Sequence, residues 1–346
     1  MSAFQHFGRC ALARERRRHL PDGTIRRVIE PDVRGLADQE LAGYIEQLRA
    51  HPGASARALG ATGLRESSAQ RAAARPPGPD LAFVEDLNGD NGVPVRLYRP
   101  CLEPRPLLVY FHGGGWTLGD LASHDRLCRL LSHVADVAVL AVDYRRAPEN
   151  PWPAAVEDAV DAVHWARREA LKLVGTTVIG VGGDSAGGNI ATLACLELRD
   201  AGEQLPDAQV LAYPNTDLTF SQPSVATKAA GWGLEADDAH WFAEQWVPEL
   251  AKRHDPRVSP LLEPDLAGLP RAVIVTAEHD PLRDEGDAYA AALRAAGVQV
   301  TWRCEPGLIH GFLGLDLVSP AAGRAVERLC QDVRSALGVA AGSPRP

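Results

Sequence analysis

The sequence predicts an α/β fold in which a mainly parallel central sheet is flanked by helices on both faces. From about residue 93, short and continuously apolar runs alternate with helical stretches. Parallel strands that are buried on both faces read as such continuous runs, and the helices between them cover the sheet. The expected strands are residues 93–98, 107–111, 138–142, 177–181, 209–213, 272–276 and 298–302.

The composition is that of a soluble globular protein with a sizeable core, since 45% of the 346 residues are hydrophobic and 23% are charged. The 36 basic and 45 acidic side chains give a formal charge of -9, the wrong sign for binding nucleic-acid phosphates. No apolar run approaches the ~20 residues of a membrane span, and the N-terminus lacks the apolar stretch of a signal peptide. We therefore expect a cytoplasmic protein without a nucleic-acid or membrane partner. A homodimer is compatible with the sequence.

The cysteines give no sign of a metal or redox site. They are scattered singly, with no CxxC pair and no histidine at metal-ligand spacing. We expect reduced, partly buried side chains and no cofactor. The six are Cys10, Cys101, Cys128, Cys195, Cys304 and Cys330.

The chain divides into an N-terminal segment, residues 1–85, and the α/β domain, residues 86–346. Within the first segment, Leu41, Tyr44, Ile45 and Leu48 recur at helical spacing and predict an amphipathic helix. Residues 51–79 are rich in Ala, Arg, Pro and Gly and are interpreted as a linker or irregular covering.

The connection over residues 214–271 is much longer than a crossover needs and predicts a lid over the active edge of the sheet. It contains a group of aromatic residues, which either contact substrate or pack the insertion onto the body. The sequence leaves both interpretations open. The group is Trp232, Trp241, Phe242 and Trp246.

A GxSxG motif, Gly183 to Gly187, follows the expected strand 177–181 and precedes an amphipathic helical stretch. Strand, tight turn and helix form the context in which this motif presents a nucleophilic serine. Upstream, HGGGW (residues 112–116) follows strand 107–111 and is typical of a loop whose backbone N–H groups stabilise an oxyanion. Two independent motifs in the expected order make Ser185 the predicted nucleophile.

A serine hydroxyl needs a general base, and the base needs an acid that fixes its tautomer. In hydrolases with this strand–turn–helix motif, the three residues follow along the chain in the order serine, acid, histidine. His310 lies just past the last expected strand and is the predicted base, whereas His279 comes too early and is interpreted as structural. The other histidines, such as His124, His164 and His254, are expected to be solvated or packed, without a companion acid.

Several acids follow strand 272–276, and Asp280 is preferred because it lies in the loop just beyond the strand end. The later acids are expected to begin the next helix, where negative charge favours the N-terminus. The candidates are Glu278, Asp280, Asp284, Glu285 and Asp287.

Together these residues resemble the hormone-sensitive-lipase-like family of α/β-hydrolases, over about residues 80–335. The matching motifs are HGGGW (112–116), DYRRAPENPWPAAVEDA (143–159), GGDSAGGN (182–189), DPLRDEG (280–286) and HGF (310–312). In the family's usual DYRLAPE motif this chain has Arg146 in place of leucine, a departure expected to lie away from the triad.

The resemblance implies an α/β-hydrolase catalytic domain with a helical cap built from the N-terminal segment and the 214–271 insertion. It implies Ser185, Asp280 and His310 as the catalytic triad, without a metal or cofactor. The backbone N–H groups of Gly113, Gly114 and Ala186 would form the oxyanion hole.

The predicted activity is that of a carboxylesterase acting on small, short-acyl esters. A deacetylase or amidase of a specific metabolite is an alternative, because the fold and triad do not set the leaving group. A non-catalytic ligand-binding protein on the same fold is a further alternative, although such a protein would be expected to lack the serine or histidine.

The choice of acid predicts a ranking of two variants. Asp280→Asn should be far slower than wild type, whereas Asp284→Asn should change the rate only a few-fold, since only Asp280 is expected to hold His310 in its working tautomer. Steady-state kinetics on one ester would test this, and the opposite ranking would assign the acid to Asp284.

Overall fold

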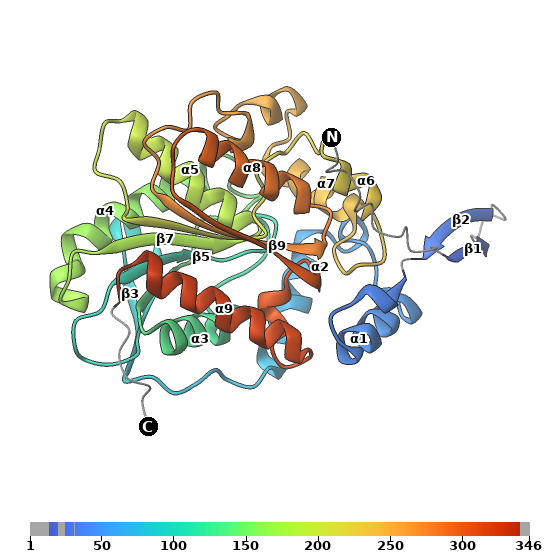
Figure 1. The fold of residues 1–346 in the computed structure, drawn as a ribbon, viewed down its shortest axis with the longest axis horizontal. Coiled ribbons are helices and arrows are strands. Elements are labelled where there is room, and N and C mark those ends of the chain that lie inside the picture. Colours follow the sequence, from blue (N-terminus) through green and yellow to red (C-terminus); the bar gives the residue numbers. More distant parts are fainter. Residues whose placement is uncertain (1–13, 20–24, 31, 340–346) are drawn as a thin grey trace, which may run out of the picture.

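A computed structural model describes residues 14–19, 25–30 and 32–339. It confirms the α/β architecture, with one eight-stranded sheet between two layers of helices (Figure 1). The strand order is β10-β9-β8-β7-β5-β6-β4-β3. The strands are β3 (Phe83–Asn88), β4 (Pro94–Arg99), β5 (Leu107–Phe111), β6 (Ala138–Val142), β7 (Ile179–Asp184), β8 (Ala208–Ala212), β9 (Arg271–His279) and β10 (Val300–Ile309).

The six strands from β5 to β10 pair in parallel, and β4 and β3 join antiparallel at one edge. All seven strands expected from apolar runs are present. Strand β3 was not predicted, because it lies at the sheet edge and its residues are exposed or half-buried, Glu85 and Asp86 among them. It therefore lacks the continuous apolar run by which the buried strands were recognised.

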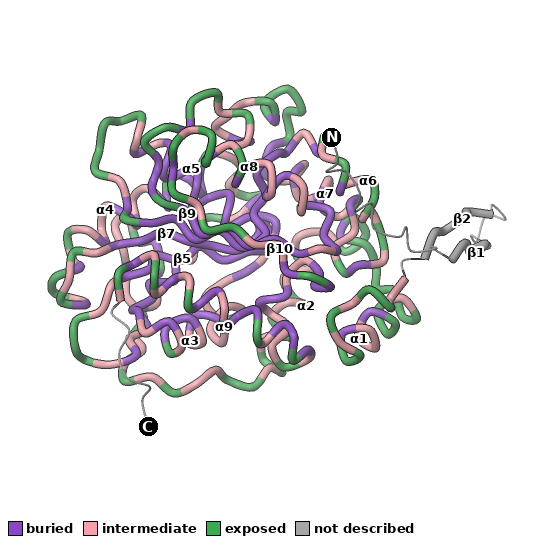
Figure 2. The backbone as a smooth tube through the Cα atoms, viewed as in Figure 1, coloured by how far each residue is buried: buried purple, intermediate pink, exposed green. Residues whose placement is uncertain are grey.

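Helices cover both faces of the sheet, as expected. Helices α3 (Asp125–Ala135) and α9 (Pro320–Ala336) lie on one face, and α4 (Ala154–Val174), α5 (Ala186–Asp200) and α8 (Arg283–Ala295) lie on the other (Figure 1). Strand β5 shows why its run is continuously apolar. Leu107, Val109 and Phe111 enter the core under α4 and α5, while Leu108 and Tyr110 enter the core under α3 and α9. The buried interior of the sheet is visible in Figure 2.

The remaining helices come from the N-terminal segment and the long insertion. They are α1 (Gln39–Ala50), α2 (Ala56–Ala74), α6 (Pro223–Thr227) and α7 (Ala236–Trp246). The two segments touch directly, because the Ala56 N–H donates to Asp238 (2.9 Å) and Arg57 pairs with Glu244 (2.7 Å). Helix α1 confirms the predicted amphipathic helix, with Leu41 fully buried.

Helix α2 corrects the interpretation of residues 51–79 as a linker. Alanine and arginine are strong helix formers, and they dominate this stretch. The misleading signal was glycine, since Gly60 has a left-handed backbone (φ 64°) and kinks the helix rather than ending it. A two-stranded antiparallel pair, β1 (Arg14–His19) and β2 (Ile25–Glu30), was also not predicted.

Short 3₁₀ turns complete the described chain at Val33–Gly35, Asp90–Gly92, Leu250–His254, Pro260–Leu262 and Phe312–Gly314. In the described ranges, no helix has both the length and the apolar character needed to cross a membrane.

Candidate active site

Ser185 occupies a sharp turn between the end of β7 and the start of α5. Its backbone has φ 55° and ψ -121°, a conformation that costs a non-glycine residue about 1–3 kcal/mol. The turn is held by the Ser185 N–H, which donates to the Ala212 carbonyl at 2.8 Å. Gly187 is required because a Cβ there would overlap the carbonyl of Phe111 at the end of β5. The turn therefore sets the serine at the carboxyl edge of the sheet.

The structure brings the other two predicted triad residues to this serine. His310, the first residue after β10, places Nε2 3.0 Å from the Ser185 Oγ and Nδ1 2.8 Å from Asp280 Oδ2. Asp280 is fully buried, and its other oxygen accepts the Leu282 N–H at 2.8 Å. A carboxylate only accepts hydrogen bonds, so Nδ1 donates to Asp280 and leaves Nε2 to accept from the serine hydroxyl.

The other candidate acids have different partners. Asp284 pairs with Arg283 (2.7 Å), Asp287 accepts from Thr276 (2.7 Å), and Glu278 accepts the Gly307 N–H (2.8 Å).

Glu285 lies in the first turn of α8, as expected, but it does not face solvent. It is fully buried and accepts the Thr216 N–H at 2.7 Å, and burial raises its pKa well above the usual value. Its carboxyl group therefore supports the start of the insertion.

His279 has a packing role, as interpreted. Its ring stacks on Trp232 with centroids 4.0 Å apart, and its Nε2 lies 3.2 Å from the Gly35 carbonyl. Within the described ranges, no group of three or more His, Cys, Asp or Glu side chains is arranged to hold a metal ion.

Asp184 links the turn that carries Ser185 to residues 112–119, here called the glycine loop. The sequence did not reveal this role. Its Oδ1 accepts the Gly113 N–H at 3.0 Å and the Tyr110 hydroxyl at 2.8 Å, and it lies 3.4 Å from His124 Nε2. Burial would raise the pKa of Asp184, but His124 and the two hydrogen-bond donors outweigh burial and hold it below the usual value. His124 thus has a companion acid, contrary to expectation. His164 does too, since its Nε2 lies 2.6 Å from a Glu203 carboxylate oxygen.

This contact changes the prediction for the oxyanion hole. The Gly113 N–H points to Asp184, so in this structure it is engaged elsewhere. The N–H groups of Gly114 and Gly115 donate to no other described backbone carbonyl, and both residues line the same pocket as Ser185. Ala186 is the first residue of α5, where N–H groups have no acceptor within the helix.

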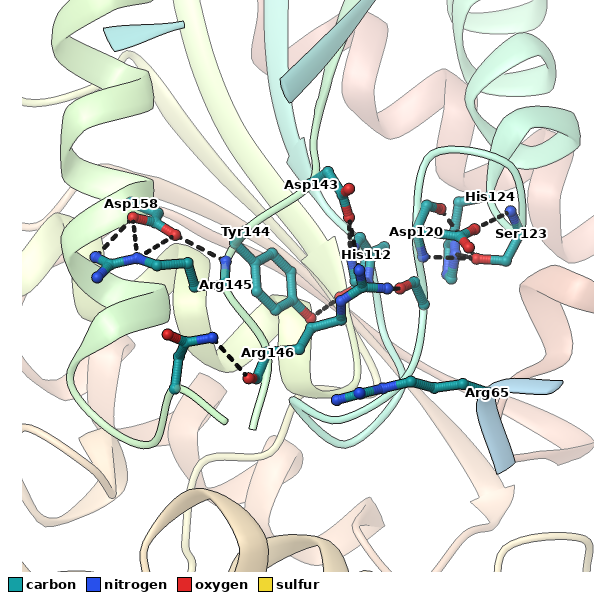
Figure 3. Close-up of polar contacts among 12 residues, drawn as sticks. Arg65, His112, Asp120, Ser123, His124, Asp143, Tyr144, Arg145, Arg146 and Asp158 are labelled. Carbon is teal, nitrogen blue, oxygen red and sulfur yellow. Dashed lines mark hydrogen bonds and ion pairs between the residues drawn. The ribbon is translucent and has the colours of Figure 1, made fainter. Parts of the chain in front are cut away.

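The loop is also supported from the segment that carries the DYRRAPE motif (Figure 3). The Tyr144 hydroxyl donates to the His112 carbonyl at 2.7 Å, and the Tyr144 ring stacks on the imidazole ring of His112. Burial lowers the pKa of His112 to about 3, so this ring is neutral near pH 7. Arg146, which departs from the family pattern, donates to the Gly119 carbonyl. The departure therefore contacts the loop.

A pocket of about 680 Å³ opens over Ser185 and His310. Its wall combines the glycine loop with side chains of α2 and α7. Arg65 connects α2 to the loop, since its guanidinium donates to the Thr117 carbonyl (2.9 Å). It also donates to the Ala147 carbonyl (2.7 Å). Figure 3 shows the guanidinium end of Arg65 pointing toward the segment that carries Arg146.

The aromatic group of the insertion separates into two roles. Phe242 lines the pocket, and its ring packs closely on Gly115. A Cβ on residue 115 would overlap the Phe242 ring. Trp246 is fully buried and stacks on Trp116 at 4.4 Å, and Trp241 meets Phe242 edge-on. Trp232, which stacks on His279, also packs the insertion onto the body.

Comparisons with known proteins place this chain in a family. Residues 108–314 match the family described as the alpha/beta hydrolase fold. The chain is 45% identical over 273 residues to a carboxylic ester hydrolase, LipN, of Mycobacterium tuberculosis, covering 75% of this chain and 73% of that protein. The chain therefore belongs to the α/β hydrolase family, as the sequence predicted.

Two further similarities bear on the fold and the chemistry. An ethyl acetate hydrolase of Pseudomonas putida is 40% identical over 256 residues, covering 72% of this chain and 80% of that protein. A solved α/β hydrolase from the metagenome of Lake Arreo superposes with a TM-score of 0.83 at 34% identity, covering 88% of this chain and all of that one.

The position of Asp184 predicts a catalytic rather than a binding defect when it is lost. Asp184→Ala should lower kcat by roughly 100-fold with little change in KM, since mispositioned oxyanion donors cost about 10²–10³ in rate. Asp184→Asn keeps an acceptor oxygen for Gly113 and Tyr110 and should retain much more activity. Steady-state kinetics with both variants would check this, and a defect confined to KM would contradict it.

Proposed function

We propose that the protein is a carboxylesterase that hydrolyses small carboxylic esters through Ser185, His310 and Asp280. The observation that carries the proposal is the continuous chain of contacts from the serine Oγ to His310 (3.0 Å) and from His310 to a fully buried carboxylate (2.8 Å). The names of the carboxylic ester hydrolase and the ethyl acetate hydrolase among the relatives support it.

In the first half of the reaction, His310 Nε2 takes the proton of the Ser185 hydroxyl as the oxygen attacks the ester carbonyl. The imidazolium that forms is stabilised by the buried Asp280 carboxylate. The tetrahedral intermediate collapses, His310 returns the proton to the departing alkoxide, and an alcohol leaves an acyl-enzyme on Ser185.

In the second half, water enters in place of the alcohol. His310 deprotonates this water as it attacks the acyl-enzyme, and the second tetrahedral intermediate expels the Ser185 oxygen, which regains its proton. A carboxylic acid is released.

The oxyanion formed in both halves needs preorganised N–H donors. With Gly113 engaged by Asp184, we assign this role to the N–H groups of Gly114, Gly115 and Ala186. Donors fixed by backbone turns need no reorganisation during the reaction, which is the basis of their catalytic value.

The N-terminal segment and the insertion are proposed to act as one cap. Their direct contacts, between Ala56 and Asp238 and between Arg57 and Glu244, support this, as does the joint contribution of α2 and α7 to the pocket wall.

Replacement of the nucleophile is the first test. Ser185→Ala should lose activity by a factor on the order of 10⁶ while keeping its thermal midpoint near that of wild type. A fluorophosphonate should label wild type once, at Ser185, as read by peptide mass spectrometry. Stoichiometric labelling of another serine would refute the assignment.

Acyl-chain length is the second test. Phe242 and Trp116 line the pocket beside Gly115. A methylene of the acyl chain that fits the pocket gains about 0.8 kcal/mol by burial, whereas one that does not fit costs about 1–3 kcal/mol by overpacking. For p-nitrophenyl esters, kcat/KM should rise from acetate to around butyrate or hexanoate and then fall. Phe242→Ala should move this optimum to longer chains. A steady rise through dodecanoate in wild type would contradict a closed acyl site.

A further inference from the structure

One face of helix α2 forms part of the pocket wall and carries two guanidinium groups. Ser68, Arg71, Ala72 and Arg75 line the pocket. Their spacing of three, four and seven residues places them on one side of the helix and its C-cap. Both arginines therefore border the same space as Ser185 and His310.

The positive charge of this face is not balanced by nearby acids. Arg75 donates to the Gly314 carbonyl and lies 3.9 Å from Asp316, but the same carboxylate is bound more closely by Arg126, at 2.6 Å. Two guanidinium groups thus share one carboxylate.

Arg71 is exposed and makes no hydrogen bond or ion pair with any part of the chain that the structure describes. Among the described pocket-lining residues, Asp184 is the single acid, and its carboxylate already serves Tyr110, Gly113 and His124. A chain with a formal charge of -9 therefore presents an unneutralised cation to its own substrate pocket.

We infer that the site takes esters that carry a carboxylate away from the scissile bond, and that Arg71 binds this carboxylate. The inference rests on the proposed esterase function and narrows its substrate class. Guanidinium matches carboxylate in geometry and gives charge-assisted hydrogen bonds. Arg75 is already engaged by the Gly314 carbonyl and by Asp316, so the unpaired guanidinium is that of Arg71.

Arg71 also lies in the last turn of α2, where a cation stabilises the helix dipole. That role acts on the stability of the helix and does not distinguish a charged from a neutral ester. The two roles therefore separate in an experiment that measures substrate preference and thermal stability on the same variants.

The test compares esters that differ only in charge. On the acyl side, monoethyl succinate is paired with ethyl 4-methylpentanoate, in which an isopropyl group replaces the carboxylate. On the alcohol side, 4-acetoxybutyrate is paired with 4-methylpentyl acetate. The ratio of kcat/KM values within each pair is measured by titrating the released acid, for wild type, Arg71→Gln, Arg71→Lys and Arg271→Gln. Arg271 is an exposed arginine at the start of β9 and serves as the matched control.

In at least one pair, Arg71→Gln should lower the charged-to-neutral ratio by about tenfold, the low end for hydrogen bonds to charged groups because Arg71 is exposed. Arg71→Lys should recover part of the ratio. Raising the salt from about 0.1 M to about 1 M should reduce the wild-type ratio. The control Arg271→Gln should leave both ratios unchanged.

If wild type hydrolyses these esters and neither ratio changes in Arg71→Gln, the inference is wrong and the esterase function stands. The same holds if Arg71→Gln lowers only the thermal midpoint, which would leave the helix-dipole role alone. If wild type hydrolyses none of the four esters, nor p-nitrophenyl butyrate, the proposed function itself fails.

Discussion

The geometry of the site depends on one strained turn, the left-handed backbone of Ser185 between β7 and α5. The turn is possible because α5 approaches the end of β5 at Gly187, where a side chain would meet the Phe111 carbonyl. Two consequences follow from neighbouring residues in the chain. Ala186 presents the first free N–H of α5 beside the serine, and Asp184 reaches across to the Gly113 N–H. Ser185, the proposed nucleophile, and the glycine loop are thereby positioned by the same few residues.

The proposed cap, made of the N-terminal segment and the 214–271 insertion, packs against that loop. Arg65 binds the loop carbonyl of Thr117, and Trp246 stacks on Trp116, so the cap and the loop share both polar and aromatic contacts. Phe242 then faces the pocket from the same insertion. A change in the packing of the proposed cap would reach the proposed oxyanion donors, because Arg65 and Trp246 contact the segment that carries those donors.

The sequence predicted the features that are local in the chain. Ser185 was found because its turn requires flanking glycines within a five-residue motif, and the buried strands because each is a short apolar run. Asp280 and His310 followed from chain order and from their place just after a strand. The sheet, its two helical layers and the proximity of the three proposed triad residues were predictable for these reasons.

The rest depends on contacts between distant segments or on environment. The partners of Asp184 come from β5, the glycine loop and the residue before α3, so no local pattern predicts that Gly113 is engaged. Edge strand β3 has no run of buried apolar residues. Helix α2 is rich in alanine, but its glycines indicated a loop. The four aromatics lie in one insertion, and only packing separates Phe242, which lines the pocket, from the three tryptophans.

We propose that Asp184 holds the Gly113 N–H, so that the oxyanion is bound by the N–H groups that follow in the loop and by that of Ala186. A crystal structure of the protein after reaction with an alkyl phosphonate ester tests this most directly, because the phosphonyl oxygen on Ser185 stands in for the oxyanion. We expect this oxygen within hydrogen-bond distance of the N–H groups of Ala186 and of Gly114 or Gly115, with the Gly113 N–H still donating to Asp184. A phosphonyl oxygen bound by the Gly113 N–H, with the Asp184 contact broken, would contradict it.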